Sequence, residues 1–138
     1  MERKRFFANQ DFLPQMLEWV RDHLIKHGMD TKAIRRIELA SEEALVNIMQ
    51  YGYGEKKGEI ELCLEFGEKQ IKLTIRDWGS PFNPIENAPA VFVDASIDER
   101  EIGGLGIHLI RQVMDEVLYT REQDANLLTL VKYFSRTM

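Results

Sequence analysis

The alternation of apolar and polar residues predicts three helices and at least four strands. Apolar residues recur at a helical spacing over residues 11–27 and 31–51, and again from about Gly104 to Met114. A period of two, typical of a strand with one buried face, runs through residues 59–66 and 69–76, and the turn between them predicts a hairpin. Two closing strands are predicted at about 117–121 and 127–134, and residues 4–8 are compatible with an early strand.

The boundaries of the first two helices are marked by residues that favour helix ends. Asp11 opens the first helix, and Gly28 closes it. Asp30 or Thr31 caps the second helix, which is expected to run to about Tyr51. The first helix is expected to bury one apolar face, formed by Leu13, Met16, Leu17, Val20, Leu24 and Ile25.

This order of elements predicts an α+β fold, a two-layer sandwich with a mostly antiparallel sheet and helices on one face. The chain has 138 residues, so residues 1–138 are expected to form a single domain. Residues 78–102 show no sustained period and contain three of the four prolines. A loop of this length is usually functional or disordered.

The amino-acid composition limits which classes of protein this chain can belong to. Apolar residues make up 44% and charged residues 30% of the chain, which is ordinary for a soluble globular protein. The single cysteine, Cys63, excludes an internal disulfide. No apolar run is long enough to span a membrane, so a soluble cytoplasmic protein with no membrane partner is expected.

The net charge of −5 is unevenly distributed. Residues 1–36 carry 8 basic and 5 acidic groups, a balance of +3. Residues 37–138 carry the other 10 basic and 18 acidic groups, a balance of −8. A nucleic-acid-binding protein normally has a basic stripe, so direct nucleic-acid binding is not expected. If residues 37–138 bind a polyanion, backbone amides or a metal ion must hold most of it. The more basic residues 1–36 are a candidate surface for a partner.

Two features in the first half of the chain carry candidate chemistry. Glu43 and Asn47 stand one turn apart on the second predicted helix, where a carboxylate can accept a proton and an amide oxygen can ligate a hard cation. A solvated helix face is the alternative. Asp77 ends a predicted strand, and Gly79 after it lets a flat ring approach the backbone. A simple turn is the alternative here.

Two more features lie in the second half. Gly103-Gly104-Leu105-Gly106 opens the third predicted helix, where free amides favour phosphate, and a flexible hinge is the alternative. The segment is not a P-loop, because no Gly-Lys-Ser/Thr follows, and no strand leads into it as in a dinucleotide-binding fingerprint. Thr129 places a hydroxyl inside an apolar closing strand, where it can also be an ordinary strand residue.

Taken in order, these residues resemble the ATPase superfamily of gyrase, a heat-shock chaperone, sensor histidine kinases and mismatch-repair proteins. In type and spacing they are similar to its short bacterial branch, the anti-sigma-factor serine/threonine kinases. The resemblance covers roughly residues 10–134 and is carried by Glu43-Ala44-Leu45-Val46-Asn47, Asp77-Trp78-Gly79-Ser80-Pro81-Phe82, Gly103-Gly104-Leu105-Gly106-Ile107-His108-Leu109-Ile110, Met114-Asp115-Glu116-Val117 and Leu128-Thr129-Leu130-Val131-Lys132.

The resemblance implies a role for each residue. Asn47 would ligate Mg²⁺ that bridges the phosphates of ATP, and Glu43 would be the base that activates the attacking hydroxyl. Asp77 would accept a hydrogen bond from the adenine amino group, with Gly79 against the ring and Thr129 supporting the base. Residues 83–102 would form the ATP lid, and Arg100 could reach the γ-phosphate from it. At the start of the third helix, the amides of Gly104, Leu105 and Gly106 would donate to the phosphates.

Some positions depart from the branch or stand outside it. The residue four after the asparagine is commonly histidine and is Tyr51 here, which bears on catalytic rate more than on ATP binding. Pro81 stands where the Asp-x-Gly-x-Gly form has its second glycine, a common variant in the short branch. His23 and His27 lie one turn apart, but the sequence offers no evident third metal ligand.

The resemblance implies a bacterial anti-sigma factor and kinase. It would bind a sigma factor, phosphorylate an anti-sigma-factor antagonist protein on serine or threonine, and so regulate transcription. The alternative is an ATP-binding partner-switching module without kinase activity, although such a module would not need Glu43 as a base. A detached histidine kinase domain is disfavoured, because no dimerisation helix with a phosphoacceptor histidine fits, and a homodimer is left open.

Overall fold

The computed structural model describes residues 1–53, 57–87 and 102–134. These residues form the strands β1 (Glu2–Phe7), β2 (Glu59–Phe66), β3 (Gln70–Asp77), β4 (Glu116–Glu122) and β5 (Ala125–Tyr133). The helices are α1 (Leu13–Lys26), α2 (Thr31–Asn47), α3 (Pro84–Asn87) and α4 (Ile102–Val113). A short 3-10 turn, η1 (Gln10–Phe12), precedes α1, and a π-helical segment, η2 (Ile48–Tyr53), follows α2.

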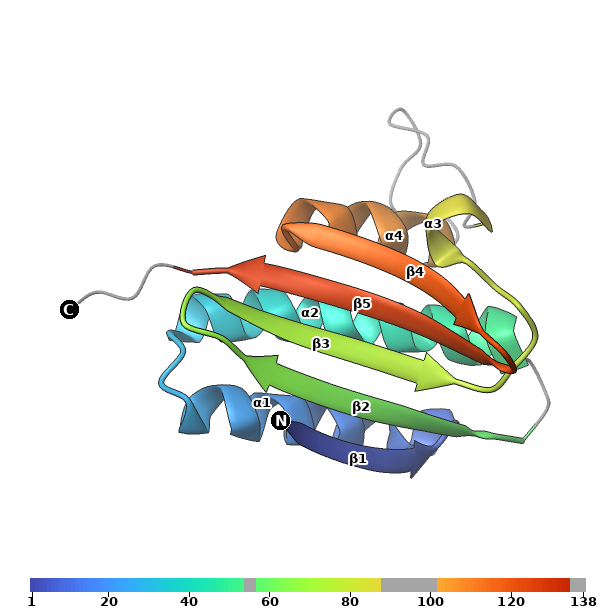
Figure 1. Cartoon of the computed structure of the whole chain (residues 1–138), viewed down its shortest axis with the longest axis horizontal. Coiled ribbons are helices and arrows are strands. Elements are labelled where there is room, and N and C mark those ends of the chain that lie inside the picture. The colour runs from blue at the N-terminus through green and yellow to red at the C-terminus, as the bar shows by residue number, and fades with distance from the viewer. Residues whose placement is uncertain (54–56, 88–101, 135–138) are drawn as a thin grey trace.

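The molecule has two layers (Figure 1). One layer is a 5-stranded sheet with the order β1-β2-β3-β5-β4, in which every neighbouring pair is antiparallel. Helices α1, α2 and α4 form the other layer on one face of that sheet. The predicted α+β class with helices on one face is therefore confirmed.

The first helix follows its predicted pattern closely. Asn9 caps the short turn η1 that precedes the helix, and its side chain accepts a hydrogen bond from the amide of Asp11 at 2.8 Å. At the other end Gly28 adopts a φ of 76°, the left-handed conformation that glycine adopts at no steric cost. The helix buries Met16, Val20 and Leu24. Ile25, expected on the same face, is 57% exposed, because it lies at the edge of the apolar stripe.

The second helix leads directly to the candidate site. Asp30 is its N-cap, and the carboxylate accepts a hydrogen bond from the amide of Ala33 at 2.8 Å. The predicted single helix to about residue 51 is in fact α2 followed by the wider turn of η2, which ends at Tyr53. The apolar face of α2 is buried against the sheet, with Ile34, Ile37, Ala40, Ala44 and Leu45 in the core.

The sheet is built from alternating residues that send apolar side chains toward the helices. In β2 and β3 these are Ile60, Leu62, Leu64, Ile71, Leu73 and Ile75, each at most 1% exposed. Burying a side chain of this size contributes about 1.5–3 kcal/mol, so this hairpin carries much of the core. The opposite face of the sheet bears charged pairs such as Arg5 of β1 with Glu61 of β2, 3.2 Å apart.

Several boundaries differ from the sequence-based prediction. β3 covers Gln70–Asp77, where the period of two runs through residues 69–76, and α4 begins at Ile102 rather than near Gly104. β5 begins at Ala125, so Asn126 belongs to a strand and not to the predicted turn. None of the helices in the described ranges is long and apolar enough to cross a membrane.

Candidate functional site

Most of the predicted site residues gather at one end of the molecule. In Figure 1 the end of α2, the end of β3 and the starts of α4 and β5 all lie on the same side. These positions belong to Asn47, Asp77, the glycine-rich segment and Asn126. The topology therefore brings together motifs that are far apart in the sequence.

Glu43 and Asn47 occupy the last turn of α2. Asn47 is 1% exposed, and neither its Oδ1 nor its Nδ2 has a hydrogen-bond partner among the described residues. A buried polar group without a partner costs about 1–3 kcal/mol, so this amide, unpaired among the described residues, is a candidate for a ligand contact. Burial, together with the neighbouring charge of Glu42, raises the pKa of Glu43 above the ordinary glutamate value.

Asp77 is a buried carboxylate at the end of β3. It is 2% exposed, and its Oδ1 accepts hydrogen bonds from the backbone amide of Gly79 at 3.0 Å and from Nδ2 of Asn126 at 2.9 Å. Burial raises the pKa of Asp77, while the hydrogen bonds from Asn126 and Gly79 and the charge of Arg121 act in the opposite direction. The group is thus a desolvated acceptor stabilised by two hydrogen-bond donors and by one nearby positive charge.

The segment that follows, Asp77–Phe82, is held by side chains of other elements. Arg121 of β4 donates to the carbonyl of Gly79 at 2.9 Å. Nδ2 of Asn126 donates to the carbonyl of Ser80 at 2.9 Å, and its Oδ1 accepts from the amide of Phe82 at 3.3 Å. This segment, named here the base loop, therefore has a fixed backbone.

Tyr53 holds the base loop from the opposite side. Its hydroxyl donates to the carbonyl of Glu59 at 2.6 Å and accepts a hydrogen bond from the amide of Trp78 at 2.7 Å. The ring lies over Gly58, where an added Cβ would be 2.2 Å from Cε1 of Tyr53, so only glycine fits there. The end of η2, the start of β2 and the base loop are thus joined through one side chain.

Asn126 and Tyr53 were missed by the sequence-based prediction. Asn126 was assigned to the turn before the last strand, whereas it pairs in register with Asp77 across β3 and β5. The two residues are 49 positions apart, so only the strand pairing reveals the contact. The one available signal was a lone amide residue next to a long apolar strand.

The structure does not bring Thr129 to Asp77. Asn126 and Asp77 are directly opposite each other and share one face of the sheet, while Thr129 is three residues further along β5 and lies on the other face. Its strand partners there are Thr74 and Leu118. The register therefore gives no support to the prediction that Thr129 supports the base, and Asn126 is the β5 residue that lies opposite Asp77.

The glycine-rich segment forms the start of α4. Gly103 and Gly104 lie in its first turn, where helix amides have no partner within the helix. Leu105 and Gly106 lie further in, where helix amides start to bond to earlier carbonyls, because the helix begins two residues earlier than predicted. Arg100 and most of the expected lid, residues 88–101, lie outside the described residues.

Tyr51, which stands where the short branch commonly has histidine, lies in η2. Its ring stacks on Phe82 of the base loop, with centroids 5.4 Å apart and an interplanar angle of 27°. An aromatic pair of this kind contributes about 0.5–1.5 kcal/mol beyond area burial. Tyr51 therefore adds a second tie between η2 and the base loop.

No group of three His, Cys, Asp or Glu side chains that could hold a metal ion occurs within the described ranges. His27 instead stacks on Phe66, and Nδ1 of His23 lies 2.9 Å from the carbonyl of Trp19. The buried amide oxygen of Asn47 is the donor that fits a hard cation, provided that most other ligands are phosphate oxygens and water.

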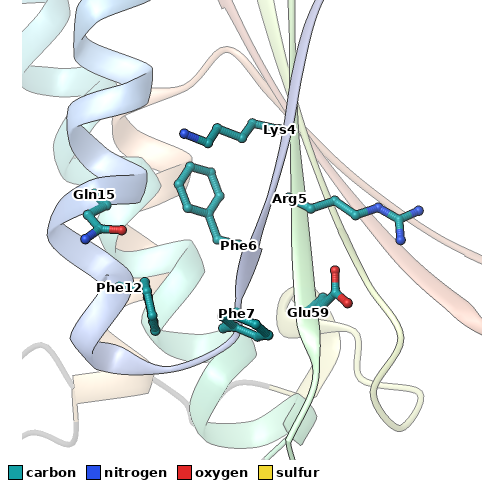
Figure 2. Close-up of a pocket in the computed structure, with 7 residues that line it drawn as sticks. All are labelled: Lys4, Arg5, Phe6, Phe7, Phe12, Gln15 and Glu59. Carbon is teal, nitrogen blue, oxygen red and sulfur yellow. The ribbon is translucent and has the colours of Figure 1, made fainter.

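A separate pocket of about 280 Å³ lies where β1 meets the start of α1. Figure 2 shows Lys4 and Phe6 turned toward the helix and Arg5 turned to the other side of β1. The remaining lining residues are Phe7, Phe12, Gln15 and Glu59. Phe7 is 62% exposed, so this pocket has an accessible aromatic rim within the more basic part of the chain.

Comparison with known proteins defines the class to which this arrangement belongs. Residues 6–132 match the family described as the histidine kinase-like ATPase domain, and the chain belongs to that family. An ATPase domain binds ATP, so this is an ATP-binding protein. The family matches the resemblance drawn from the sequence motifs.

Within this family, the chain is similar to proteins named as serine-protein kinases. The serine-protein kinase RsbW of Staphylococcus epidermidis is 30% identical over 123 residues, which cover 79% of this chain and 71% of the relative. The RsbW of Staphylococcus aureus strain bovine RF122 is 32% identical over 108 residues, covering 75% of this chain and 67% of the relative.

Solved structures show the same fold. The RsbU and RsbW domains of a Mycobacterium tuberculosis protein match with a TM-score of 0.65 and 15% identity, covering 99% of this chain and 34% of that one. The catalytic domain of the histidine kinase ThkA matches with a TM-score of 0.56 and 14% identity, covering 96% of both chains.

Proposed function

We propose that this chain is a protein serine/threonine kinase and anti-sigma factor that transfers the γ-phosphoryl group of ATP to an antagonist protein. The observation that carries the proposal is the buried amide of Asn47, one turn from Glu43 and without a partner among the described residues, in a chain 30% identical to serine-protein kinases. A binding module without transfer chemistry would not need a desolvated carboxylate beside that amide.

Recognition of the base is assigned to Asp77. Its carboxylate would accept a hydrogen bond from the exocyclic amine of adenine, and Gly79 would lie against the ring. The base loop is held in place by hydrogen bonds from Tyr53, Arg121 and Asn126, so little conformational entropy needs to be lost there on binding.

The phosphates are assigned to the other half of the site. The first-turn amides of α4, including that of Gly104, would donate to phosphate oxygens at the positive end of the helix dipole. Asn47 would ligate Mg²⁺, which when bound neutralises charge on the phosphates. Leu105, Gly106 and Arg100 stay predictions for further phosphate contacts.

Glu43 is assigned as the base. In the transfer, the substrate hydroxyl gives its proton to the Glu43 carboxylate as its oxygen bonds to the γ-phosphorus, and the bond from that phosphorus to the β-phosphate oxygen breaks. The products are a phosphoprotein and ADP. A glutamate whose pKa is raised by burial accepts a proton more readily than an exposed one, which supports this role.

The expected protein partners are a sigma factor and an anti-sigma-factor antagonist, in the cytoplasm where ATP is available. The pocket between β1 and α1 supports a partner surface in the first 36 residues, because an exposed aromatic rim and basic side chains lie side by side there. A homodimer through another exposed surface is compatible with this assignment.

Replacing Glu43 tests the kinase assignment. Glu43→Gln keeps the size of the side chain but cannot accept the proton, so phosphoryl transfer should fall about 100-fold or more. ATP affinity should change less than about threefold, because Asn47 and Asp77 remain. Glu42→Gln is the matched control and should keep transfer. The assay measures labelled phosphate on an antagonist protein together with ATP binding by calorimetry.

The same assay separates the kinase from the partner-switching module. The stack of Tyr51 on Phe82, in place of an ionisable imidazole, is the observation that favours the module. If the wild type captures a sigma factor in an ATP-dependent way but transfers no phosphate, the module is correct. If Glu43→Gln transfers phosphate as fast as the wild type, Glu43 is not the base.

A further inference from the structure

Asn126 is a buried side chain whose hydrogen-bonding capacity is fully used. It is 3% exposed at the start of β5. Its two amide hydrogens go to Oδ1 of Asp77 and the carbonyl of Ser80, both at 2.9 Å. Its Oδ1 accepts from the amide of Phe82 at 3.3 Å and from the hydroxyl of Tyr119.

These partners determine how the amide group is oriented. A backbone amide can only donate and a backbone carbonyl can only accept, so Phe82 must face the oxygen of Asn126 and Ser80 must face its nitrogen. With the nitrogen placed there, Asn126 presents a donor, and not an acceptor, to Asp77. The orientation thus follows from the surrounding backbone and does not depend on Asp77 itself.

The consequence for Asp77 is an asymmetry between its two oxygens. Oδ1 already accepts from Asn126 and from the amide of Gly79. The described residues give Oδ2 no donor, so this oxygen is the one left for a ligand. A carboxylate held at one oxygen by two donors also has its plane fixed, which a single contact would not achieve.

We propose that Asn126 is a positioning residue for purine recognition, which holds Asp77 with Oδ2 as a free acceptor and so makes the site select a 6-amino over a 6-oxo purine. This inference rests on the proposed assignment of Asp77 to the base of ATP. A 6-amino group donates to Oδ2. A 6-oxo group would oppose its own oxygen to that of the carboxylate, with no proton between them.

The protonation state of Asp77 supports the same role. Burial raises the pKa of Asp77, and the hydrogen bond from Asn126 is the largest influence that lowers it. Among the described residues, the charged or titratable side chains that interact with Asp77 are Arg121 of β4 and Tyr53 of η2. Its strand neighbour on β2 is the apolar Ile60. Without Asn126, Asp77 would take up a proton at a higher pH and become a donor.

The test compares ATP with ITP, which carries the same triphosphate and a 6-oxo purine. Wild type should prefer ATP. Asn126→Leu, which has a similar size and no donor, should lower the ATP:ITP affinity ratio about tenfold or more, as expected for a hydrogen bond to a charged group. The pH at which ATP affinity is half lost should also move upward.

Tyr119→Phe is the matched control. It removes a different hydrogen bond of Asn126 and leaves the donor to Asp77 in place, so it should lower thermal stability but keep the ATP:ITP ratio and the pH profile. A purely structural role for Asn126 predicts instead that both variants lose stability and neither changes selectivity, which would overturn the proposal.

Asn126→Asp decides the question if Asn126→Leu does not fold. This variant keeps the shape but replaces the donor by a carboxyl group, so two carboxyls would share one proton and the pH midpoint for ATP binding should rise. An unchanged midpoint and ratio would overturn the proposal. Failure of the wild type itself to bind ATP would instead overturn the assignment of Asp77 to adenine.

Discussion

Two buried asparagines mark two halves of the site with opposite properties. Asn126, at the base loop, uses both its amide hydrogens and its oxygen in hydrogen bonds within the protein. Asn47, at the end of α2, is equally buried and has no hydrogen-bond partner among the described residues. On the proposed assignment, the base half is therefore complete in the protein alone, while the phosphate half would be completed by the ligand.

This difference indicates how each half of the site would contribute to the free energy of binding. At the base loop the polar groups are already paired, so the ligand adds one contact to a prepared surface. At Asn47 a desolvation cost of about 1–3 kcal/mol is carried by the free protein and is relieved when a partner arrives. The phosphate half thus exchanges stability of the free protein for affinity.

The largest expected effect comes from Asp77→Asn. An amide in this place would turn a donor toward the adenine amine, and the two donors would oppose each other, so ATP affinity should fall about 100-fold or more. Asp124→Asn, in the exposed turn before β5, is the control and should bind ATP normally. Calorimetric titration measures both, and an Asp77→Asn protein with wild-type affinity would remove Asp77 from the site.

The same variant has a consequence for stability with a definite sign. The folded-state pKa of Asp77 is raised by burial, so the native protein binds more protons than the unfolded chain, and Asp77 lowers stability as pH rises from the unfolded pKa through the folded one. Asp77→Asn removes this contribution. Its stability relative to wild type should therefore increase with pH across that window.

A smaller effect is expected from Tyr53→Phe, which tests whether the base half is complete in the free protein. The change leaves the carbonyl of Glu59 and the amide of Trp78 without their partner, and the free energy of unfolding should fall by about 2 kcal/mol. Tyr133→Phe removes an exposed hydroxyl that bonds Glu116, and it should cost less than about 0.5 kcal/mol. Equal losses in urea unfolding would contradict the distinction.

The smallest expected change in stability comes from Asn47→Leu, and its comparison with Asn126→Leu is the most direct test of the difference between the two halves. Asn47→Leu removes an unpaired polar group and should stabilise the ligand-free protein by about 1 kcal/mol, while Asn126→Leu should destabilise it. ATP with Mg²⁺ should raise the melting temperature of wild type but not of Asn47→Leu. A loss of stability in both ligand-free variants would break the comparison.

The sequence predicted well what depends on local spacing. The helical period placed Glu43 and Asn47 one turn apart, and the alternation in residues 70–77 placed Asp77 at a strand end. The helix layer and the hairpin followed from the same periods. These features need only neighbours within a turn or a strand.

What depends on pairing between distant strands was not predictable. Leu127, Leu128, Thr129, Leu130 and Val131 form an almost continuous apolar run, so the period of two gives no face for Thr129. The partnership of Asn126 with Asp77 depends on the register of β3 against β5. The start of α4 was displaced for a similar reason, because a glycine-rich segment carries no apolar period to mark where the helix begins.

The π-helical segment η2 has a consequence for insertions and deletions during evolution. In a π-helix each backbone hydrogen bond spans one more residue than in an α-helix, and η2, which has this wider turn, brings the Tyr53 hydroxyl to the base loop. Losing one residue between Asn47 and Tyr53 would rotate the tyrosine by about 100° relative to α2. Homologous chains that share this link should therefore tolerate substitutions in the segment but keep its length.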